Sequence, residues 1–492
     1  MELQFEKREL SCLVQAVRAV KELEVTQEIR LTESMPDVGR VLAGWGQVVL
    51  RGKEWQGNRI AASGGVQATV LYAPEDGTEP RTVEAWIPFQ MKWDVSDGDR
   101  EGPMRMMPLL RFIDGRNLSA RKILVRAGVA CLGEGLIQKR TEIFSPPPVP
   151  EDVELLRRSY PVRLPREAGE KSFTMEETLE VGSHPVSEIL SYTMQPEVTE
   201  SRISGDKVVF RGIGRLHLVY RCREGRIRTR DFEVPFSQLG ELESHYDSDA
   251  TVDTMLAVTG LELEPAEEKL ALKSSLTAQY LIAHRTMLEL VADAYSPSRE
   301  VGIRQEELYL PMILDETRER LRAQGDFPDV RMEVADGVFW PGFPQTSRTG
   351  DRAEMEIPGR FQILGDNADG DLRTATARWE GRISLAADER SRMDAVTIPT
   401  GDVQWNGMEA HAEVEVRTVT QSRRGLPMIT GLELGAIRET ETMRPSLVLC
   451  RPSGRDVWKM ARDCGASPAA IRLVNGIREE PEDDGMLLIP IP

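Results

Sequence analysis

The chain has 492 residues, a hydrophobic content of 40% and a formal net charge of −18. This length exceeds what one hydrophobic core supports and predicts three or four domains. The negative charge argues against nucleic acid or an anionic membrane surface as the main partner, because both would repel the chain at long range. A protein partner remains open.

The five cysteines are scattered along the chain and form no Cys-x-x-Cys pair. This usage favours a reducing compartment over a disulfide framework. The segment from Met1 to Arg8 has no apolar region of the kind found in signal peptides, and no run of about 18 apolar residues occurs. We therefore expect a cytoplasmic protein without a transmembrane segment.

Residues 1 to about 440 carry a pattern of alternating apolar and polar side chains. Leu23, Val25, Ile29 and Leu31 alternate with polar residues, most of them charged. A period of two residues is typical of half-buried strands. The run from Leu270 to Ile282 keeps the same parity, and a helix there is the alternative. The sequence therefore predicts a mainly β fold.

An internal repeat lies within this strand-rich region. Residues 38–72 align without a gap on residues 186–220, at an offset of 148, and each copy is followed by a Pro-Phe pair. A third, more diverged copy keeps the spacing of Gly57 and Gly77 at Gly350 and Gly370. Such long copies indicate tandem domains and not a short-period solenoid. We predict three β-rich domains of the sandwich type at residues 1–148, 171–300 and 301–442.

A proline-rich segment follows the first of these domains. Residues 146–150 contain four prolines and read as a stiff spacer of the polyproline type. The pattern of residues 151–159 favours a short helix. We therefore predict that residues 149–170 form a linker with a short helix.

The last segment, residues 443–492, has the pattern of a small βααβ domain. An apolar run at residues 446–450 predicts a strand, and Asp456 stands where the N-cap of a helix belongs, with Gly465 as its stop. Ser467 and Pro468 predict the start of a second helix, whose apolar face contains Ala470, Ile471 and Val474. Asn475-Gly476 ends that helix, and residues 486–490 can pair as a strand with the first run.

This C-terminal module resembles a LysM domain. The residues that fall on the family pattern are Gly454, Trp458, Met460, Ala461, Gly465, Ser467, Ile471, Asn475, Gly476, Ile477, Gly485 and Pro490. The resemblance implies that Trp458 packs inward and that a groove lies between the first strand-helix loop and the loop after the second helix. It gives as groove candidates Gly454, Arg455, Asp456, Asn475, Gly476 and Ile477. Arg455 and Asp456 stand where the family usually has Asp and Thr.

The whole arrangement resembles SPOCS-domain proteins of the SipL type. The motifs that carry it are Met1-Glu2-Leu3, Ile29-Arg30-Leu31 with Pro36-Asp37-Val38, the turns at Gly57 and Gly205, the Pro-Phe pairs, and residues 119–125. The resemblance implies a non-enzymatic adaptor of spore-coat assembly in the mother cell, at the forespore surface, whose LysM domain binds a coat morphogenetic ATPase. The alternative is a peptidoglycan-binding protein of the cell wall or spore cortex, which binds N-acetylglucosamine chains.

Motifs for catalysis or cofactor binding are not apparent. The sequence has no phosphate-binding loop, and its five histidines have no second His or Cys at metal-ligand spacing. Residues 365–370 resemble a calcium loop, but the first Asp is missing and a hairpin turn is favoured. We expect no catalytic residue, no metal and no cofactor.

Two further clusters could lie on the surface. The first contains five arginines, at positions 221, 223, 226, 228 and 230, and the last three share one face of a predicted strand. We favour a solvated strand face that prevents edge pairing, with a docking patch as the alternative. The second cluster, residues 339–344, places aromatic residues among prolines and could form an exposed interaction site.

Overall fold

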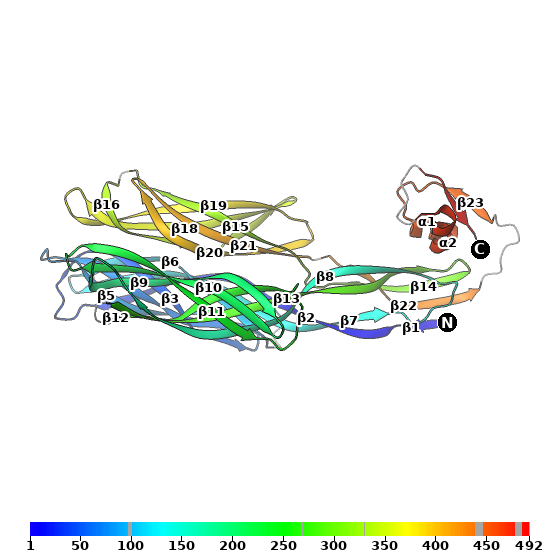
Figure 1. The fold of residues 1–492 in the computed structure, drawn as a ribbon, viewed down its shortest axis with the longest axis horizontal. Helices are drawn as coiled ribbons and strands as arrows, with labels where there is room; N and C mark the ends of the chain where they lie inside the picture. The colour runs from blue at the N-terminus through cyan, green and yellow to red at the C-terminus, as the bar shows by residue number, and fades with distance from the viewer. Residues whose placement is uncertain are drawn as a thin grey trace.

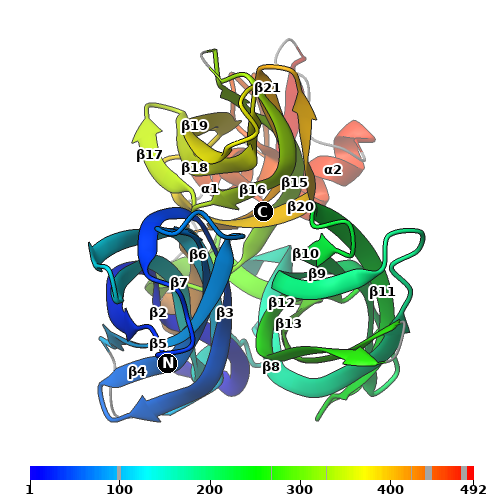
Figure 2. The same cartoon turned by 90° about the vertical axis from the view of Figure 1, so that its left-hand side faces the viewer.

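The computed structural model describes residues 1–96, 101–266, 269–328, 330–422, 424–437, 446–477 and 485–491. Three strand-rich lobes lie side by side at one end of an elongated molecule, and a stalk of strands leads from them to a small C-terminal module (Figure 1). Seen along the long axis, the lobes form a triangle (Figure 2). The predicted mainly β fold is therefore confirmed.

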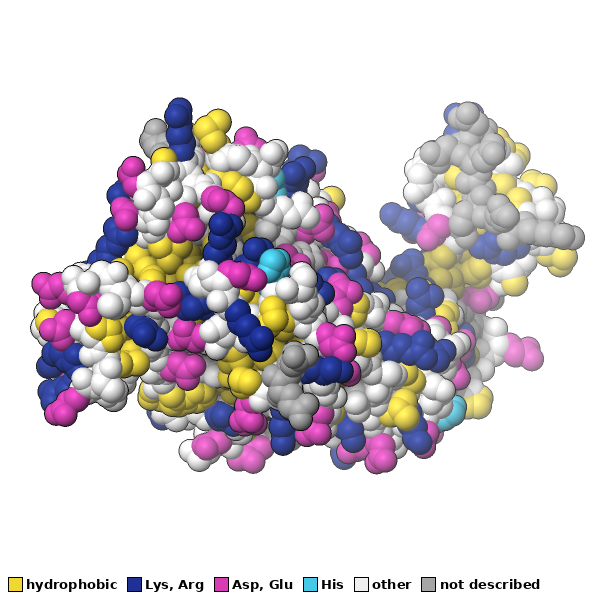
Figure 3. Space-filling view, turned by 60° about the vertical axis from the view of Figure 1, so that its left-hand side comes forward, with side chains coloured by type: hydrophobic (Ala, Val, Ile, Leu, Met, Phe, Trp, Pro, Cys, Tyr) yellow, Lys and Arg dark blue, Asp and Glu magenta, His cyan; other side chains and the backbone are white. Residues whose placement is uncertain are grey.

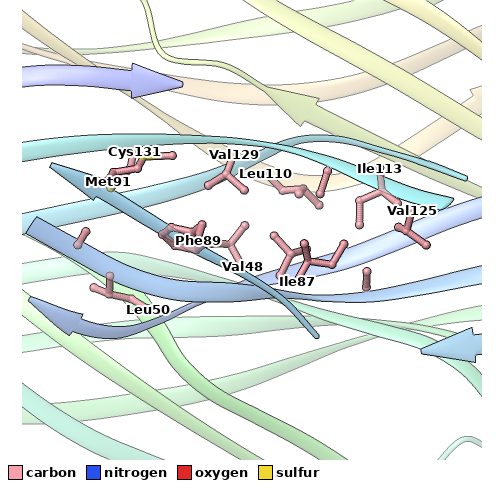
Figure 4. Close-up of a cluster of buried hydrophobic side chains, with 14 of the residues drawn as sticks. Val48, Leu50, Ile87, Phe89, Met91, Leu110, Ile113, Val125, Val129 and Cys131 are labelled. Carbon is pink, nitrogen blue, oxygen red and sulfur yellow. The ribbon is translucent and has the colours of Figure 1, made fainter. Parts of the chain in front are cut away.

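The first lobe consists of two antiparallel three-stranded sheets. Its strands are β2 (Glu6–Arg30), β3 (Val38–Gln56), β4 (Arg59–Pro74), β5 (Arg81–Asp94), β6 (Met104–Ser119) and β7 (Lys122–Ser145). The sheet orders are β2-β7-β6 and β3-β4-β5. Side chains such as Val48, Phe89 and Val129 meet between the sheets (Figure 4) and form the core of the lobe.

The second lobe repeats this topology. Its strands are β8 (Glu154–Leu179), β9 (Val186–Ser204), β10 (Lys207–Cys222), β11 (Ile227–Glu241), β12 (Thr251–Ala266) and β13 (Lys269–Tyr295). The sheet orders are β12-β13-β8 and β11-β10-β9. As in the first lobe, the first strand and the last two strands of the lobe form one sheet, and the three strands between them form the other. The run from Leu270 to Ile282, where a helix was the alternative, lies within strand β13.

The third lobe follows the same plan with one interruption. Its strands are β15 (Ile313–Asp326), β16 (Met332–Pro341), β17 (Gln345–Thr349), β18 (Arg352–Asn367), β19 (Leu372–Ala386), β20 (Ser391–Asn406) and β21 (Glu409–Ser422). One sheet has the order β15-β21-β20, and in the other β18 pairs with β16, β17 and β19. The strand that corresponds to β3 is interrupted after Pro341, so β16 and β17 together occupy the position of β3 beside β18.

The first two copies of the predicted repeat have matching strand positions. β3 and β9 begin at Val38 and Val186, and β4 and β10 begin at Arg59 and Lys207, each pair at the offset of 148. Gly64 lies opposite Phe89, just as Gly212 lies opposite Phe236. A side chain on either glycine would collide with a backbone oxygen and with the facing ring. The predicted hairpin turn at Gly370 is also present, between β18 and β19.

The predicted short helix at residues 151–159 is wrong. This segment enters β8, which pairs with β13 over its whole length, from Leu270 opposite Leu179 to Tyr295 opposite Glu154. Local helix propensity is a weak preference, and pairing with a long neighbouring strand overrides it. Residues 154–170 of the predicted linker are therefore part of a sheet.

The stalk joins segments from distant parts of the chain. It contains β1 (Glu2–Gln4), β14 (Arg299–Leu308) and β22 (Leu426–Ile437) in the order β1-β22-β14, beside the extended ends of β2, β7, β8 and β13 (Figure 1). Leu10 from β2, Leu164 from β8 and Met428 from β22 share one buried cluster. The predicted boundary between residues 442 and 443 lies outside the described residues.

Buried polar contacts hold the three lobes together. Arg105 of β6 forms an ion pair with Asp253 of β12 at 2.7 Å, which connects the first and second lobes. Asp336 of β16 in the third lobe accepts a hydrogen bond from the indole of Trp45 in the first lobe and contacts the ring of His217 in the second. The lobes therefore form one body with specific internal contacts.

The aromatic segment at residues 339–344 does not form an exposed interaction site. Phe339, Trp340 and Phe343 are all buried, and Trp340 packs into the core of the first lobe. Trp340 and Phe343 pack against residues of the first lobe, whereas Phe339 packs inside the core of the third lobe. The segment therefore joins the third lobe to the first.

Candidate interaction module

The C-terminal module has the predicted order of strand, helix, helix and strand. Its elements are β23 (Leu447–Cys450), α1 (Val457–Cys464), α2 (Pro468–Asn475) and β24 (Leu487–Pro490). β23 and β24 pair in antiparallel register. Neither helix, and no other helix in the described part of the chain, is long and apolar enough to cross a membrane.

Both helices begin and end at the residues predicted from the sequence. The carboxylate of Asp456 accepts a hydrogen bond from the backbone amide of Lys459, which satisfies one of the free donors at the start of α1. Gly465 and Gly476 end α1 and α2 in the left-handed conformation, with φ of 64° at each. Glycine adopts this conformation without the steric cost that a Cβ would add.

Trp458 lies where the module meets the stalk and does not occupy the centre of the module. The buried centre contains Val457, Met460, Ala461, Ile471 and Ile489. Trp458 is only partly buried, its ring stands edge-on to Tyr295 at 4.9 Å, and its indole donates to Asp293 at 2.9 Å. The expectation that it is the inward core residue is therefore corrected, because β13 provides the surface on which it packs.

Two more contacts strengthen this junction. The hydroxyl of Tyr295 donates to the backbone oxygen of Ala466 at 2.8 Å, and Arg462 forms an ion pair with Asp293 at 2.5 Å. Burial raises the pKa of Tyr295, so its hydroxyl stays protonated and available as a donor. The module is thus attached to the stalk through specific side chains.

The side chain of Arg455 is folded back onto its own loop. Its guanidinium donates to the backbone oxygens of Arg451 and Pro452 and to Asp463, each at 3.2 Å. It also lies 3.3 Å from the sulfur of Cys450. The bond to Asp463 raises the pKa of Arg455. The donors that we expected to face a groove are engaged within the module.

The other predicted groove residues are also engaged within the module. The side-chain amide of Asn475 donates to the backbone oxygens of Ile471 and Leu488 and accepts from the amide of Leu488, so it ties α2 to β24. Ile477 packs against the buried centre. Gly454 has a φ of 75° in the turn before α1. Their roles in binding remain predictions, but each has a structural function.

An exposed apolar surface lies on the same module. In the described residues sixteen large apolar side chains are exposed, and five of them belong to this small module: Leu447, Leu449, Leu473, Val474 and Met486. We call these five residues the apolar surface. Leu473 is 83% exposed, and Figure 3 shows hydrophobic side chains on the visible face of the module. Leu447 and Leu449 lie on the face of the β23–β24 pair that turns away from the buried centre, and Leu473 and Val474 lie on α2. So many exposed apolar side chains on one small module indicate an interaction site.

The sequence contained a partial signal for this surface. Leu447 and Leu449 share one face of β23 and lie opposite Pro490 and Leu488. The alternation of side chains along a strand therefore predicts that this face of the strand pair is apolar. The sequence predicts Val474 on the apolar face of α2, but in the structure 47% of its side chain is exposed. Only the fold shows that α2 buries Ile471 and turns Val474 outward.

The fold also gathers histidines and carboxylates that are far apart in the sequence. In the described residues His217 lies near Asp231 and Asp402, and His284 lies near Asp247 and Asp249. Both ring nitrogens of His217 already contact carboxylates, Asp231 at 2.6 Å and Asp336 at 2.8 Å. This histidine therefore has a structural explanation as the centre of an ion-pair network.

The comparisons with known proteins concern the second lobe. The family model described as "SipL, SPOCS domain" matches residues 185–264, which run from the start of β9 into β12. No curated protein matches the chain. The match supports the SPOCS resemblance for this lobe and with it a role connected to sporulation, whereas the LysM resemblance of the module stays a prediction.

Proposed function

We propose that this chain is a non-enzymatic scaffold of spore-coat assembly whose C-terminal module binds a protein partner through the apolar surface. The observation that carries the proposal is the exposure of Leu447, Leu449, Leu473, Val474 and Met486 on one small module. The SPOCS match in the second lobe gives the biological setting. By the resemblance stated above, the partner is a coat morphogenetic ATPase, and the site of action is the mother-cell side of the forespore surface.

The surface chemistry of the module favours a protein over a glycan chain. Binding a sugar chain requires polar groups that face its hydroxyls, whereas Arg455 and Asn475 use their polar atoms inside the module. Exposed leucines, in contrast, gain free energy when a partner removes them from water. The apolar surface therefore fits the buried centre of a protein interface.

The lobes and the stalk would serve as a rigid support. The ion pair of Arg105 with Asp253 connects the first and second lobes, and Tyr295 and Asp293 of the stalk hold the module at the end of the long axis (Figure 1). A module fixed in this way has a defined orientation relative to the lobes. This arrangement suits a protein that positions a partner relative to other coat components.

The test replaces two leucines of the apolar surface, Leu449→Ser with Leu473→Ser, in the full chain. The matched control replaces two exposed apolar residues elsewhere, Leu239→Ser with Met287→Ser. We expect the first variant to lose binding to the purified coat morphogenetic ATPase by about 2 kcal/mol or more in isothermal titration, as central interface residues do. The control should bind like the wild type.

Two outcomes would contradict the proposal. Unchanged affinity of the Leu449→Ser, Leu473→Ser variant would remove the apolar surface from the interface. Retention of the wild-type chain on insoluble peptidoglycan, together with no binding to the ATPase, would instead favour the glycan-binding alternative.

A further inference from the structure

A charged cleft lies between the second and third lobes, at the end of the lobes that Figure 1 shows far from the module. Its volume is about 950 Å³. The wall from the second lobe carries Arg226, Arg228 and Arg230, and Arg331 lies on the wall from the third lobe. We call these four residues the arginine cleft. A cleft of this size is large enough for a short peptide segment.

The four arginines have few partners within the protein, although Arg230 lies over the ring of Phe232 at 5.7 Å. Within the described residues none of them forms an ion pair, whereas Arg221 on the neighbouring strand pairs with Glu188 at 3.1 Å. The Nε atom of Arg228 is buried and has no hydrogen-bond acceptor. A buried donor without a partner lowers stability unless an incoming acceptor satisfies it. The unpaired charge thus points to a ligand with carboxylate or similar oxygen atoms.

The cleft also contains acidic groups, but fewer of them. Glu333 and Asp366 line the wall from the third lobe, where they face each other across β16 and β18. Glu224, in the turn before β11, contacts His184 at 3.4 Å. Four guanidinium groups against two lining carboxylates leave the cleft positive, in a chain whose formal net charge is −18.

The first lobe shows that the fold does not require this cluster. Arg228 lies opposite Tyr220, and its counterpart Arg81 lies opposite Tyr72. The same register makes Val83 the counterpart of Arg230. Two residues before Arg228 and Arg81, in the turns that precede β11 and β5, stand Arg226 and Glu79. The strand therefore forms with an apolar residue in place of Arg230, and the turn before it forms with an acidic residue in place of Arg226. The two additional arginines of the second lobe need another explanation.

We propose that the arginine cleft binds an acidic peptide segment of a partner protein. Arginine forms charge-assisted, often bidentate hydrogen bonds with carboxylates, and three arginines at every second position match a run of acidic side chains. From Arg226 to Arg230 an extended chain covers about 13 Å, longer than one phosphate group. Nucleic acid is disfavoured because the remaining surface of the chain is strongly negative.

This site is separate from the apolar surface of the module and does not depend on it. The experiment titrates the full chain into fluorescein-labelled hexaglutamate and follows the anisotropy of the label, with hexaglutamine as the uncharged control. We expect hexaglutamate to bind and hexaglutamine not to bind. The affinity should fall as salt rises, because the contacts are ionic.

The decisive variant is Arg226→Glu with Arg230→Val, which introduces the residues of the first lobe and should therefore fold. We expect it to weaken hexaglutamate binding at least tenfold. Arg140→Glu with Arg8→Val makes the same change in charge at exposed positions of the stalk and should bind like the wild type. An equal loss in both variants, or no binding of hexaglutamate to the wild type, would overturn the proposal.

Two other probes separate the remaining ligand classes. Inorganic pyrophosphate that competes with hexaglutamate at equal concentration would show a site for small anions. A single-stranded oligothymidine that binds more tightly than hexaglutamate, and loses this affinity in the Arg226→Glu, Arg230→Val variant, would show a nucleic-acid site. Either result would contradict the proposed acidic peptide.

Discussion

Arg105 and Glu134 form an ion pair at 2.5 Å on adjacent strands of the first lobe, where their side chains are 3% and 0% exposed. Arg18 also contacts Glu134, at 2.8 Å. Burial alone would raise the pKa of Glu134, but the two arginines outweigh it and hold the pKa at about 2. Because Arg105 also contacts Asp253 of the second lobe, this pair contributes to the junction between lobes.

Replacement of Glu134 by Leu should destabilise the protein by roughly 3 to 5 kcal/mol, because two buried guanidinium groups would lose their main partner. Urea unfolding at neutral pH measures this change. Glu142→Leu is the matched control, since Glu142 pairs with Lys7 on the surface. Its replacement should change the free energy of unfolding by less than about 1 kcal/mol. Equal effects of the two variants would contradict the importance of the buried pair.

The same pair predicts a pH dependence with a definite sign. The folded-state pKa of Glu134 is depressed from about 4.5 to about 2, so its contribution to stability is present above pH 4.5 and is lost as the pH falls toward 2. We expect the difference in unfolding free energy between wild type and Glu134→Leu to shrink over this acidic window. A constant difference would show that the ionised carboxylate is not responsible.

Local patterns predicted the parts of the fold that depend on neighbouring residues. The strand parity, the turns at Gly57 and Gly205 and the N-cap at Asp456 are all present, because each depends on a few adjacent residues. Contacts between distant segments were not predictable in this way. The pairing of β1 with β22 and the packing of Trp458 on Tyr295 depend on how the stalk assembles, which no local pattern records.

His217 should give a pH dependence of the opposite sign. Burial would lower its pKa, but Asp231 and Asp336 outweigh this and raise the pKa to about 10. Its contribution to stability is therefore fully present below about pH 6.5 and is lost as the pH rises through about 10. Unfolding curves of wild type and His217→Gln should converge over that range. His245→Gln, at an exposed position, is the matched control.

The repeat predicts that Gly64→Ala and Gly212→Ala have similar effects. A Cβ would lie 2.2 Å from the backbone oxygen of Val49 in the first case and 2.1 Å from that of Glu197 in the second. We expect each substitution to cost about 1 to 3 kcal/mol by overpacking. Gly260→Ala, where the nearest atom is 3.4 Å away, is the control. Thermal unfolding of the three variants decides whether the two lobes are equivalent.

Trp458→Ala should release the module from the stalk without unfolding it, because the buried centre is formed by other residues. Hydrogen exchange should increase at the end of β13 while the amides of α1 and α2 stay protected. Met460→Ala should instead destabilise the module itself by about 2 to 5 kcal/mol, as buried methionines do. Loss of protection in α1 and α2 in both variants would return Trp458 to the core of the module.

Asn475 and Arg455 separate a structural role from a binding role within the predicted groove. Asn475→Ala removes two hydrogen bonds that join α2 to β24 and one within α2, so that backbone groups of Leu488 lose a partner. This should lower the stability of the module by about 1 to 3 kcal/mol. Arg455→Gln should have a smaller effect, because the ion pair with Asp463 lies at the surface.

The same two variants test what the groove binds. If the apolar surface carries the interface, Arg455→Gln should bind the protein partner like the wild type, since the guanidinium is already engaged with its own loop. Asn475→Ala should weaken binding only at temperatures where the module begins to unfold. Isothermal titration at two temperatures measures both effects. A large loss of affinity for Arg455→Gln at the lower temperature, with an unchanged melting curve, would place the interface in the predicted groove and not on the apolar surface.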